Sequence, residues 1–286
     1  MQVRGLRRST EICDLRESHL HRRSKIDPSS YAFSLLADEY ENRPRASHMV
    51  FIGNPGTGKT ALGRLLAKAY HELGILRKPK FLEVERMDLV GKDRQNTVLK
   101  TREVLEEAKG GILFIDEAFT LGIVKKREKV DSAIDAIQEL IVCMDQNEYS
   151  DQMTDFPLII LAGFPVEMQR FMSSQKELRR RFPLVFEFPD YTCRELATIF
   201  KDLANVKGFD LEEDLTIPII ADLLECETSA EWRNERNGRV CELLLAGARS
   251  EVRNRRRAAN FDGEEDVDPH LIVLEDVENV VRLEFK

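Results

Sequence analysis

The chain has 286 residues, a length that fits two domains or one large domain with a lid. Its 43 Lys and Arg against 51 Asp and Glu give a net charge of −8, which argues against a protein that coats nucleic acid. The most apolar stretch, Phe156 to Phe164, is shorter than the roughly 18 residues that cross a bilayer. The five cysteines show no CxxC spacing. We therefore expect a soluble intracellular protein, cytoplasmic unless it resides in a plastid or nucleus, with no nucleic-acid or membrane partner.

Short apolar runs bounded by turn residues alternate with longer stretches of helical spacing. Helical spacing is found in Ala61 to Gly74 and in the apolar positions from Ala133 to Met144. Strands that alternate with helices predict an α/β domain, in which a parallel sheet is covered on both faces. The predicted strands are Met49 to Gly53, Phe81 to Val84, Ile112 to Asp116, Leu158 to Ala162 and Leu184 to Phe188.

The strand pattern fades after Pro189, and a helical region is predicted to follow. Its expected helices are Thr192 to Val206, Leu215 to Cys226 and Asn237 to Arg255. We predict a helical or irregular segment at residues 1–47, an α/β nucleotide-binding domain at 48–189 and a helical lid with an acidic C-terminal tail at 190–286. The tail, Asp262 to Asp268, follows a basic cluster at Arg253 and Arg255–Arg257. Charge runs are typical of solvated faces, and we assign these no function.

An eight-residue motif follows the first predicted strand. Its sequence GNPGTGKT fits the pattern G-x-x-x-x-G-K-[ST] and lies between a strand and a helix, as a phosphate-binding loop requires. Glycines let the backbone wrap around a polyphosphate, and the loop N–H groups converge on the anion. Lys59 is expected to neutralise the β- and γ-phosphates, and the Thr60 hydroxyl to bind Mg²⁺. The predicted nucleotide-binding residues are Gly53, Asn54, Pro55, Gly56, Thr57, Gly58, Lys59 and Thr60.

Two adjacent carboxylates end the third predicted strand. A buried strand of a parallel sheet places such residues at the carboxyl edge, where the ligand crevice lies. Asp116 is therefore predicted to hold Mg²⁺ through water, and Glu117 to polarise the water that attacks the γ-phosphate. The alternative is an acidic strand end in a solvated turn, which a preceding phosphate-binding loop makes less favourable.

The combination of motifs resembles the CbbX/CfxQ branch of AAA+ ATPases, which includes the red-type Rubisco activases, from about His48 to about Arg257. The resemblance implies a P-loop NTPase parallel sheet, the AAA+ core, followed by a small all-helical lid. It also implies ATP and Mg²⁺ as cofactors and assembly into a ring, usually a hexamer, with ATP between neighbours. The segments that carry it are HMVFIGNPGTGKT (His48 to Thr60), DLVG (Asp88 to Gly91), GGILFIDEAFTL (Gly110 to Leu121), LIILAGFP (Leu158 to Pro165), RFP (Arg181 to Pro183) and FPDY (Phe188 to Tyr191).

Two arginines gain roles from the resemblance. Arg181 resembles the arginine finger that reaches the γ-phosphate in an adjacent subunit, with Arg179 as the second choice; a guanidinium stays charged and can make two hydrogen bonds to a phosphoryl group. Arg239, in the segment Asn237 to Arg239, resembles a lid residue that contacts the nucleotide. The alternatives are a basic surface turn for Arg181 and an ordinary helix start for Arg239.

Three features depart from the family pattern. Gly163 and Phe164 stand where many AAA+ proteins place a polar group that orients water, although the CbbX branch likewise has an aromatic there. Lys92, Asp93 and Arg94 follow DLVG, where relatives place an aromatic and a glycine in the loop facing the central pore. The segment before the first strand lacks a clear adenine-contacting pattern, so no base-binding residue is assigned.

We therefore predict a Mg²⁺-dependent AAA+ ATPase that forms a ring and uses hydrolysis to remodel a protein client, for which the resemblance suggests Rubisco. One alternative is a nucleotide-binding regulatory subunit, slow or inactive in hydrolysis, that assembles with a partner AAA+ chain. Another is a P-loop kinase of small molecules. The adjacent Asp116 and Glu117, the finger candidate Arg181 and the helical lid fit water as the acceptor better than a substrate hydroxyl.

Overall fold

The computed structural model describes residues 47–123, 132–148, 156–262 and 268–284. The predicted N-terminal segment, except for Ser47, and residues 263–267 of the predicted acidic tail lie outside the described residues. The chain divides into two compact units. The first contains residues up to Gly53 and Gly58–Phe188, and the second contains Asn54–Thr57 and the chain from Pro189 onward.

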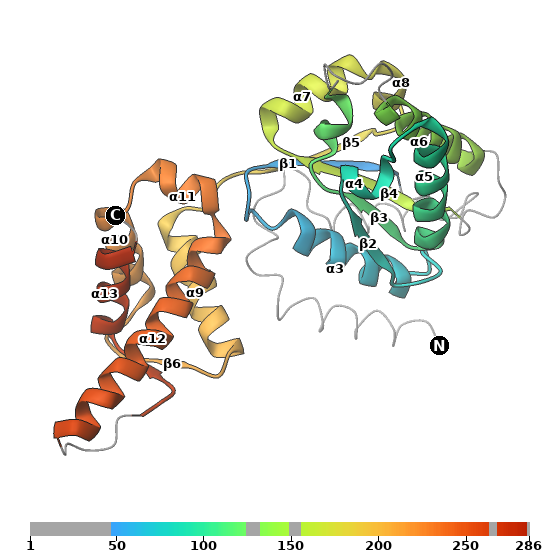
Figure 1. Cartoon of the computed structure of the whole chain (residues 1–286). Helices are drawn as coiled ribbons and strands as arrows, with labels where there is room; N and C mark the ends of the chain where they lie inside the picture. Colours follow the sequence, from blue (N-terminus) through green and yellow to red (C-terminus); the bar gives the residue numbers. More distant parts are fainter. Residues whose placement is uncertain (1–46, 124–131, 149–155, 263–267, 285–286) are drawn as a thin grey trace, which may run out of the picture. The chain divides into compact units, whose positions relative to one another are not determined.

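The first unit is built on a five-stranded parallel sheet in the order β2-β3-β4-β1-β5 (Figure 1). All five predicted strands are confirmed to within one residue at each end. An all-parallel sheet needs a crossover between each strand and the next, and the intervening helices supply it. The strands are β1 (Met49–Gly53), β2 (Phe81–Val84), β3 (Ile112–Ile115), β4 (Leu158–Gly163) and β5 (Leu184–Phe188).

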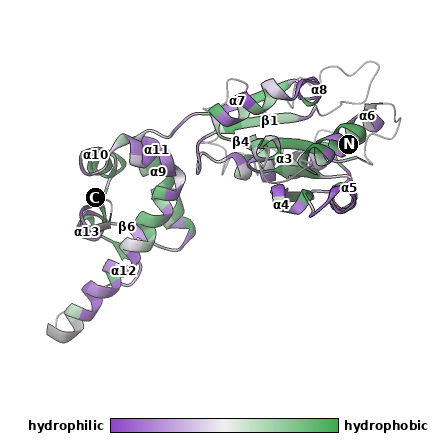
Figure 2. Ribbon diagram, turned by 45° about the horizontal axis from the view of Figure 1, so that its top comes forward, coloured by the Kyte–Doolittle hydropathy of each residue, from purple (hydrophilic) through white to green (hydrophobic). Residues whose placement is uncertain are grey.

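Helices cover both faces of this sheet, as the apolar strands require. Met49 and Phe51 point to a core shared with α3 (Lys59–Glu72). Val50 points to the opposite core, which the other helices cover, and Figure 2 shows β1 and β4 as mostly hydrophobic. The elements on this second side are α4 (Arg86–Leu89), α5 (Arg94–Ala108), the 3₁₀ helix η1 (Ala118–Gly122), α6 (Ser132–Glu148), α7 (Pro165–Ser174) and α8 (Lys176–Arg179).

The second unit is mainly helical, as predicted, and has a core of its own. Leu196 and Phe200 of one helix pack there with Leu244 and Val281 of two others. Among the described helices of either unit, none combines the length and apolarity needed to cross a bilayer. The elements are α9 (Cys193–Val206), β6 (Asp210–Leu211), α10 (Ile217–Glu227), α11 (Ala230–Arg236), α12 (Gly238–Asp262), β7 (Leu271–Ile272) and α13 (Leu274–Glu284).

The acidic stretch at 262–268 is not a C-terminal tail, which corrects the sequence prediction. β7 follows it and pairs in parallel with β6, and α13 then packs into the core of the second unit. The physical reason is the apolar spacing of Val277, Val280 and Val281, which lie on one helical face and are buried. The chain therefore remains folded after its most acidic stretch.

The residue before β1 makes the stability of the fold depend on pH. The backbone N–H of Ile159 donates to Nδ1 of His48 (2.9 Å), and burial lowers the pKa of His48 from 6.5 to about 4. As pH falls from about 6.5 to about 4, His48 therefore becomes protonated in the unfolded chain while it stays neutral in the folded chain. We expect a loss of at most about 3 kcal/mol of unfolding free energy across this window. Denaturant titrations at both ends of the window, on the native chain and on His48→Gln, measure it; an equal pH dependence in both would contradict the assignment.

Candidate nucleotide-binding site

The GNPGTGKT motif connects β1 to α3, with Gly53 ending the strand and Lys59 and Thr60 opening the helix. Gly56 and Gly58 have φ angles of 72° and 93°, in the left-handed region that favours glycine. Lys59 is buried, and its Nζ donates to the carbonyl oxygen of Gly53 (2.8 Å). The loop thus has the backbone form that its sequence predicts, with the ammonium group held against it.

The apex of this loop, Asn54–Thr57, groups with the second unit and is fixed there by a polar network. Asn54 Nδ2 donates to both carboxylate oxygens of Asp190 (2.9 and 3.1 Å). Asn237 Nδ2 donates to Asp190 Oδ1 (2.9 Å) and to the Pro55 carbonyl (3.2 Å). Asp190 therefore holds two amide side chains that come from distant parts of the sequence.

Close backbone approach explains the small residues at this contact. The backbone N–H of Gly238 donates to the carbonyl of Gly56 (3.0 Å). A Cβ on Gly56 would stand 2.1 Å from the Arg236 carbonyl oxygen, and one on Gly238 would stand 2.9 Å from that of Gly56. Asn237, almost fully buried, has a positive φ of 49° with a ψ of −122°, a conformation that is uncommon for a residue with a side chain. Both glycines are thus required by the packing.

Arg239, the predicted lid residue, is the second residue of α12. Its side chain is exposed, and within the described ranges it forms no ion pair. The structure fixes the segment immediately before it through Asn237. Arg239 is therefore an exposed cation two residues after Asn237, which hydrogen-bonds to the Pro55 carbonyl of the loop.

The paired carboxylates follow β3 directly. The backbone N–H of Asp116 donates to the Val84 carbonyl (2.9 Å), and Asp116 Oδ1 accepts from the backbone N–H of Glu117 (2.9 Å). Glu117 is exposed and has a φ of 45°, an uncommon conformation for a residue with a side chain. Strain of this kind is concentrated at functional sites. The turn therefore leaves Asp116 half-buried and Glu117 exposed.

The sheet order brings the two motifs to one edge. β1 and β3 are the two neighbours of β4, and all three strands run parallel. Their carboxyl ends therefore lie along the same edge, which is where open α/β sheets bind ligands. Lys59 and Thr60 follow one of these strands and Asp116 and Glu117 the other, as the sequence predicted.

Aromatic packing occupies the end of the central strand β4. The rings of Phe119 and Phe164 lie 5.5 Å apart between centroids, at an interplanar angle of 38°. A Cβ on Gly163 would stand 2.9 Å from Phe119 and 2.8 Å from Met168, so glycine is needed here. The position where many AAA+ proteins have a polar group thus holds a packed aromatic pair.

Arg181, the predicted finger, is held within its own chain. Its Nε and Nη2 donate to the two carboxylate oxygens of Asp145 on α6 (2.6 and 2.8 Å), and the side chain is 19% exposed. The hydrogen bonds from Arg181 hold the pKa of Asp145 below its usual value. By contrast, Arg179 and Arg180 are exposed. The predicted finger must therefore exchange an existing partner before it can bind a phosphate.

The segment after DLVG is mostly committed to internal contacts. Asp93 caps α5 by accepting from the backbone N–H of Asn96 (2.9 Å), and Arg94 pairs with Asp135 on α6 (3.0 Å). Lys92 is exposed. Large apolar side chains are exposed before and after it in the chain, Met87 on α4 at 77% and Leu99 on α5 at 58%. Two of the three charged residues predicted to face a client thus have a partner within the chain, although the Arg94 side chain remains 72% exposed.

Sequence reasoning missed three residues that hold these motifs in place: Asp145, Asp190 and Arg86. The guanidinium of Arg86 donates to the carbonyl oxygens of Thr120 and Ile123, which ties α4 to η1 directly after Glu117. No local sequence pattern identifies these residues as the hydrogen-bond partners of the site segments. The available signal for Asp190 is its place in the FPDY segment, which does not identify Asn54 and Asn237 as its partners.

Comparison with known proteins gives the site its family. The family described as "ATPase family associated with various cellular activities (AAA)" matches residues 49–190, and a domain of unknown function (DUF8495) matches residues 190–284. The chain belongs to the AAA ATPase family. Within that family it is of the CbbX/CfxQ type, as the sequence resemblance indicated.

The AAA domain is similar to that of two curated bacterial proteins and to one solved structure. Stage V sporulation protein K of Bacillus subtilis is 40% identical over 170 residues, 59% of this chain and 50% of that protein. Protein CbbX of Cereibacter sphaeroides is 41% identical over 164 residues, 57% of this chain and 50% of that protein. The chain thus spans about half the length of these relatives. The FIGL-1 AAA domain shares the fold, with a TM-score of 0.58 at 17% identity, over 90% of this chain and 80% of that one.

The residues present in this AAA ATPase fit a nucleotide and a hard divalent cation. The left-handed glycines open the loop backbone, and the Lys59 ammonium lies against it. The hydroxyl of Thr60 and the carboxylate of Asp116 are oxygen ligands of the kind Mg²⁺ prefers. The chemistry of these side chains therefore suits a Mg²⁺-nucleotide complex at this edge of the sheet.

Proposed function

We propose that this AAA ATPase is Mg²⁺-dependent, assembles into a ring and uses ATP hydrolysis to remodel a protein client. The observation that carries the proposal is the meeting of two motifs at one sheet edge, Lys59 and Thr60 after β1 and Asp116 and Glu117 after β3. Such an edge can bind a triphosphate and direct a water at it.

Each residue has a separate task in the proposed hydrolysis. The backbone N–H groups of residues 53–60 and the Lys59 ammonium bind the phosphates, while the Thr60 hydroxyl and Asp116 hold the metal. The metal, when bound, neutralises charge on the phosphate oxygens. Glu117 accepts a proton from the attacking water and is exposed enough to reach it. Arg239 would contact the nucleotide.

The ring part of the proposal depends on Arg181. A finger acts on the nucleotide of a neighbouring subunit, so a monomer would lack a complete site, and the family resemblance suggests a hexamer. In this chain Arg181 is already placed at the end of α8 by Asp145, in a geometry that matches a bidentate oxygen acceptor. A phosphoryl group offers the same pair of oxygens.

The client is proposed to be a protein, and the resemblance makes Rubisco one candidate. Threading an arbitrary chain needs an apolar grip that does not depend on sequence. Lys92, Asp93 and Arg94 all remain exposed, although Asp93 caps α5 and Arg94 pairs with Asp135, and none of the three offers an apolar surface. We infer that the protein does not thread arbitrary polypeptides and that its client presents a defined charged segment or docks elsewhere.

A second candidate function is a regulatory subunit that binds nucleotide, hydrolyses it slowly and assembles with a partner AAA+ chain. The observation that favours it is that Arg181, the predicted finger, is engaged by Asp145 of its own chain. In that case remodelling would be supplied by the partner.

Measuring ATPase rate together with particle mass, with and without ATP, tests the proposal. For the remodeller we expect a rate on the order of 1 per second or faster in a closed ring, and no stimulation by a generic unfolded protein. A negligible rate that a second AAA+ chain restores would favour the regulatory subunit. Strong stimulation by the unfolded protein that Met87→Ala removes, while Lys92→Ala does not, would show that the protein does thread chains.

A further inference from the structure

The C-terminal half of α12 concentrates positive charge within an acidic region. Residues 249–257 contain 5 arginines, whereas residues 189–286 together contain 13 Lys and Arg against 23 Asp and Glu. A helix turns about 100° and rises about 1.5 Å per residue, so four of these arginines fall within about 100° of the helix surface over about 12 Å. We call these four, Arg249, Arg253, Arg256 and Arg257, the arginine stripe.

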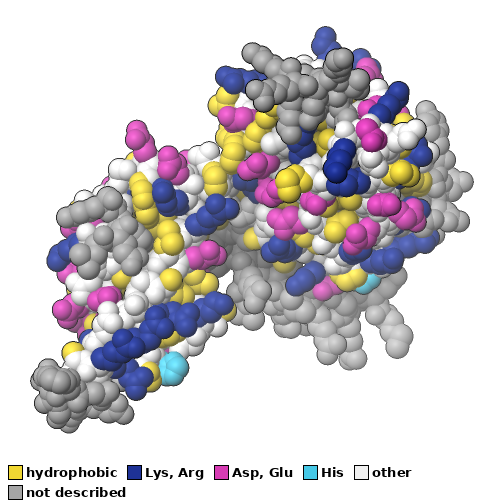
Figure 3. Space-filling view, viewed as in Figure 1, with side chains coloured by type: hydrophobic (Ala, Val, Ile, Leu, Met, Phe, Trp, Pro, Cys, Tyr) yellow, Lys and Arg dark blue, Asp and Glu magenta, His cyan; other side chains and the backbone are white. Residues whose placement is uncertain are grey.

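The stripe is a visible feature of the surface. Arg249, Arg253 and Arg257 are exposed and Arg256 is half-buried. Figure 3 shows a continuous dark-blue band of Lys and Arg along this part of the second unit, and Figure 2 shows the same stretch of α12 as hydrophilic. The band is therefore a continuous cationic surface rather than isolated charges.

The fifth arginine of this stretch, Arg255, stabilises the fold. Arg255 points away from the stripe, and its Nη2 donates to Asp276 Oδ2 (3.0 Å) and to the Leu271 carbonyl (2.9 Å). Asp276 is 3% exposed. This pair joins α12 to β7 and α13, so one arginine of the five has a structural task.

The four arginines of the stripe make no contact comparable to the Arg255–Asp276 ion pair among the described residues. Within the described part of the chain, none of its arginines forms an ion pair, although the unit is rich in carboxylates. The nearest carboxylate on the helix, Glu251, accepts instead from Asn254 (3.0 Å) and Asn279 (3.5 Å). Arg256 Nε is buried and has no hydrogen-bond partner among these residues. Like charges on adjacent turns repel, so the folded chain alone gives no reason for this arrangement.

One end of the stripe is held in place by an aromatic side chain. The Arg249 guanidinium lies 5.4 Å from the centre of the Phe209 ring, and the Phe209 ring lies 5.8 Å from that of His270. A guanidinium stacked on a ring keeps its N–H groups free at the edge of its plane. Arg249 is thus ordered before a ligand arrives, which lowers the entropy lost on binding.

We propose that the arginine stripe is a docking site for an acidic segment of a partner polypeptide. Carboxylates match the planar fork of arginine, and spacings of three and four residues on a partner helix repeat the spacing of the stripe. A polyphosphate chain is disfavoured because tight nucleic-acid binding at physiological salt uses many phosphate contacts, whereas these four arginines lie in a region with a large excess of acid. The proposal goes beyond the proposed ATPase cycle and does not depend on it.

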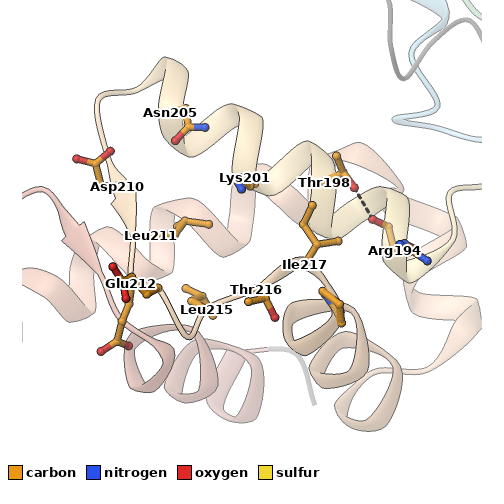
Figure 4. Close-up of a pocket in the computed structure, with 12 residues that line it drawn as sticks. Arg194, Thr198, Lys201, Asn205, Asp210, Leu211, Glu212, Leu215, Thr216 and Ile217 are labelled. Carbon is orange, nitrogen blue, oxygen red and sulfur yellow. Dashed lines mark hydrogen bonds between the residues drawn. The ribbon is translucent and has the colours of Figure 1, made fainter.

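A second polar surface in the same unit offers a matched control. A groove of about 610 Å³ runs between α9 and the start of α10. Arg194 and Lys201 line it from α9, while Asp210 and Glu212 line it from β6 and the residue after it (Figure 4). Because both signs of charge face this groove, it has no preference for an anion. Arg194 and Lys201 are nevertheless exposed, so reversing their charge alters the unit as much as reversing two arginines of the stripe.

Binding of a fluorescent peptide of about 12 Glu residues, long enough to cover the stripe, tests the proposal on the full chain. The ionic strength is about 0.15 M, where charges beyond about 8 Å are largely screened. We expect Arg253→Glu with Arg257→Glu to weaken binding at least about tenfold, and Arg194→Glu with Lys201→Glu by less than about twofold. The milder change of Arg253 and Arg257 to Gln should give an intermediate loss. Unchanged ATPase rate and melting temperature in all variants show that the fold is intact.

Three results would overturn the proposal. The first is an equal loss in the stripe and groove variants, which would mean that only net charge matters. The second is equal binding of a matched Gln peptide. The third is binding of a DNA oligonucleotide of the same charge as tightly as the Glu peptide, with the same dependence on Arg253 and Arg257, which would identify a nucleic-acid surface instead.

Discussion

Lys59→Ala is expected to remove ATP binding, whereas Glu117→Gln is expected to bind ATP normally and fail to hydrolyse it. Lys59 supplies the positive charge at the loop, and hydrogen bonds to charged groups are worth enough that its loss weakens affinity by about 10- to 100-fold or more. Glu117 contributes a proton acceptor, so its amide should lower kcat by about 10²- to 10⁴-fold with little change in affinity. Equilibrium binding of ATP and steady-state hydrolysis separate the two effects.

Two exposed residues provide controls for this pair of variants. Lys68 lies on α3, the helix that Lys59 opens, and Glu103 lies on α5, away from the strand ends. Lys68→Ala and Glu103→Gln should change neither binding nor rate by more than about twofold, since surface substitutions of this kind are nearly neutral. Normal turnover in Glu117→Gln would show that another residue activates the water.

The strands and the two strand-end motifs were predictable because their signals are local. Each strand is a short apolar run, and the buried runs Ile112–Ile115 and Leu158–Gly163 are followed directly by turn residues. The phosphate-binding loop is a contiguous pattern whose glycines adopt the left-handed conformation that the pattern implies. A parallel sheet then places the ends of β1 and β3 at one edge without further information.

Contacts between distant residues were not predictable in the same way. Asn54 and Asp190 are 136 positions apart, and Asp145 and Arg181 are 36 apart, so no spacing rule connects them. The pairing of β6 with β7 joins two strands of two residues each, too short to leave a periodic signal. The acidic stretch at 262–268 is typical of a solvated tail, whereas the apolar positions that follow it form the helix α13.

These distant contacts change how the charged residues of the first unit are interpreted. Three carboxylates of α6 each hold an arginine: Asp135 binds Arg94 (3.0 Å), Glu139 binds Arg102 (2.7 Å) and Asp145 binds Arg181 (2.6 Å). From the sequence, Arg94 and Arg181 were assigned to a client loop and a finger. The structure shows that α6 positions both, so any test of Arg181 must distinguish catalysis from loss of this support.

Arg181→Ala is expected to leave ATP affinity of the monomer within about twofold while lowering kcat by about 10³-fold or more, the effect credited to arginine fingers. The reason is that the finger acts on charge that develops in the neighbour's transition state and not on bound ATP. Mixing tests the shared site directly. Subunits carrying Arg181→Ala and subunits carrying Lys59→Ala should recover activity together, because at some interfaces an intact loop meets an intact finger.

The ion pair supplies the variant that separates a finger from a structural support. Asp145→Ala removes the carboxylate but leaves the Arg181 guanidinium, which still contacts the carbonyl oxygen and the carboxylate of Glu177. If Arg181 acts on the neighbour's phosphate, Asp145→Ala should keep most of the rate, since the guanidinium itself is retained. If Arg181 only joins α8 to α6, Asp145→Ala should reduce the rate as much as Arg181→Ala, and both should lower the melting temperature equally. Equal losses in these two variants, together with no recovery in mixtures of exchanging subunits, would remove Arg181 from the catalytic site and leave the exposed Arg179 as the remaining candidate.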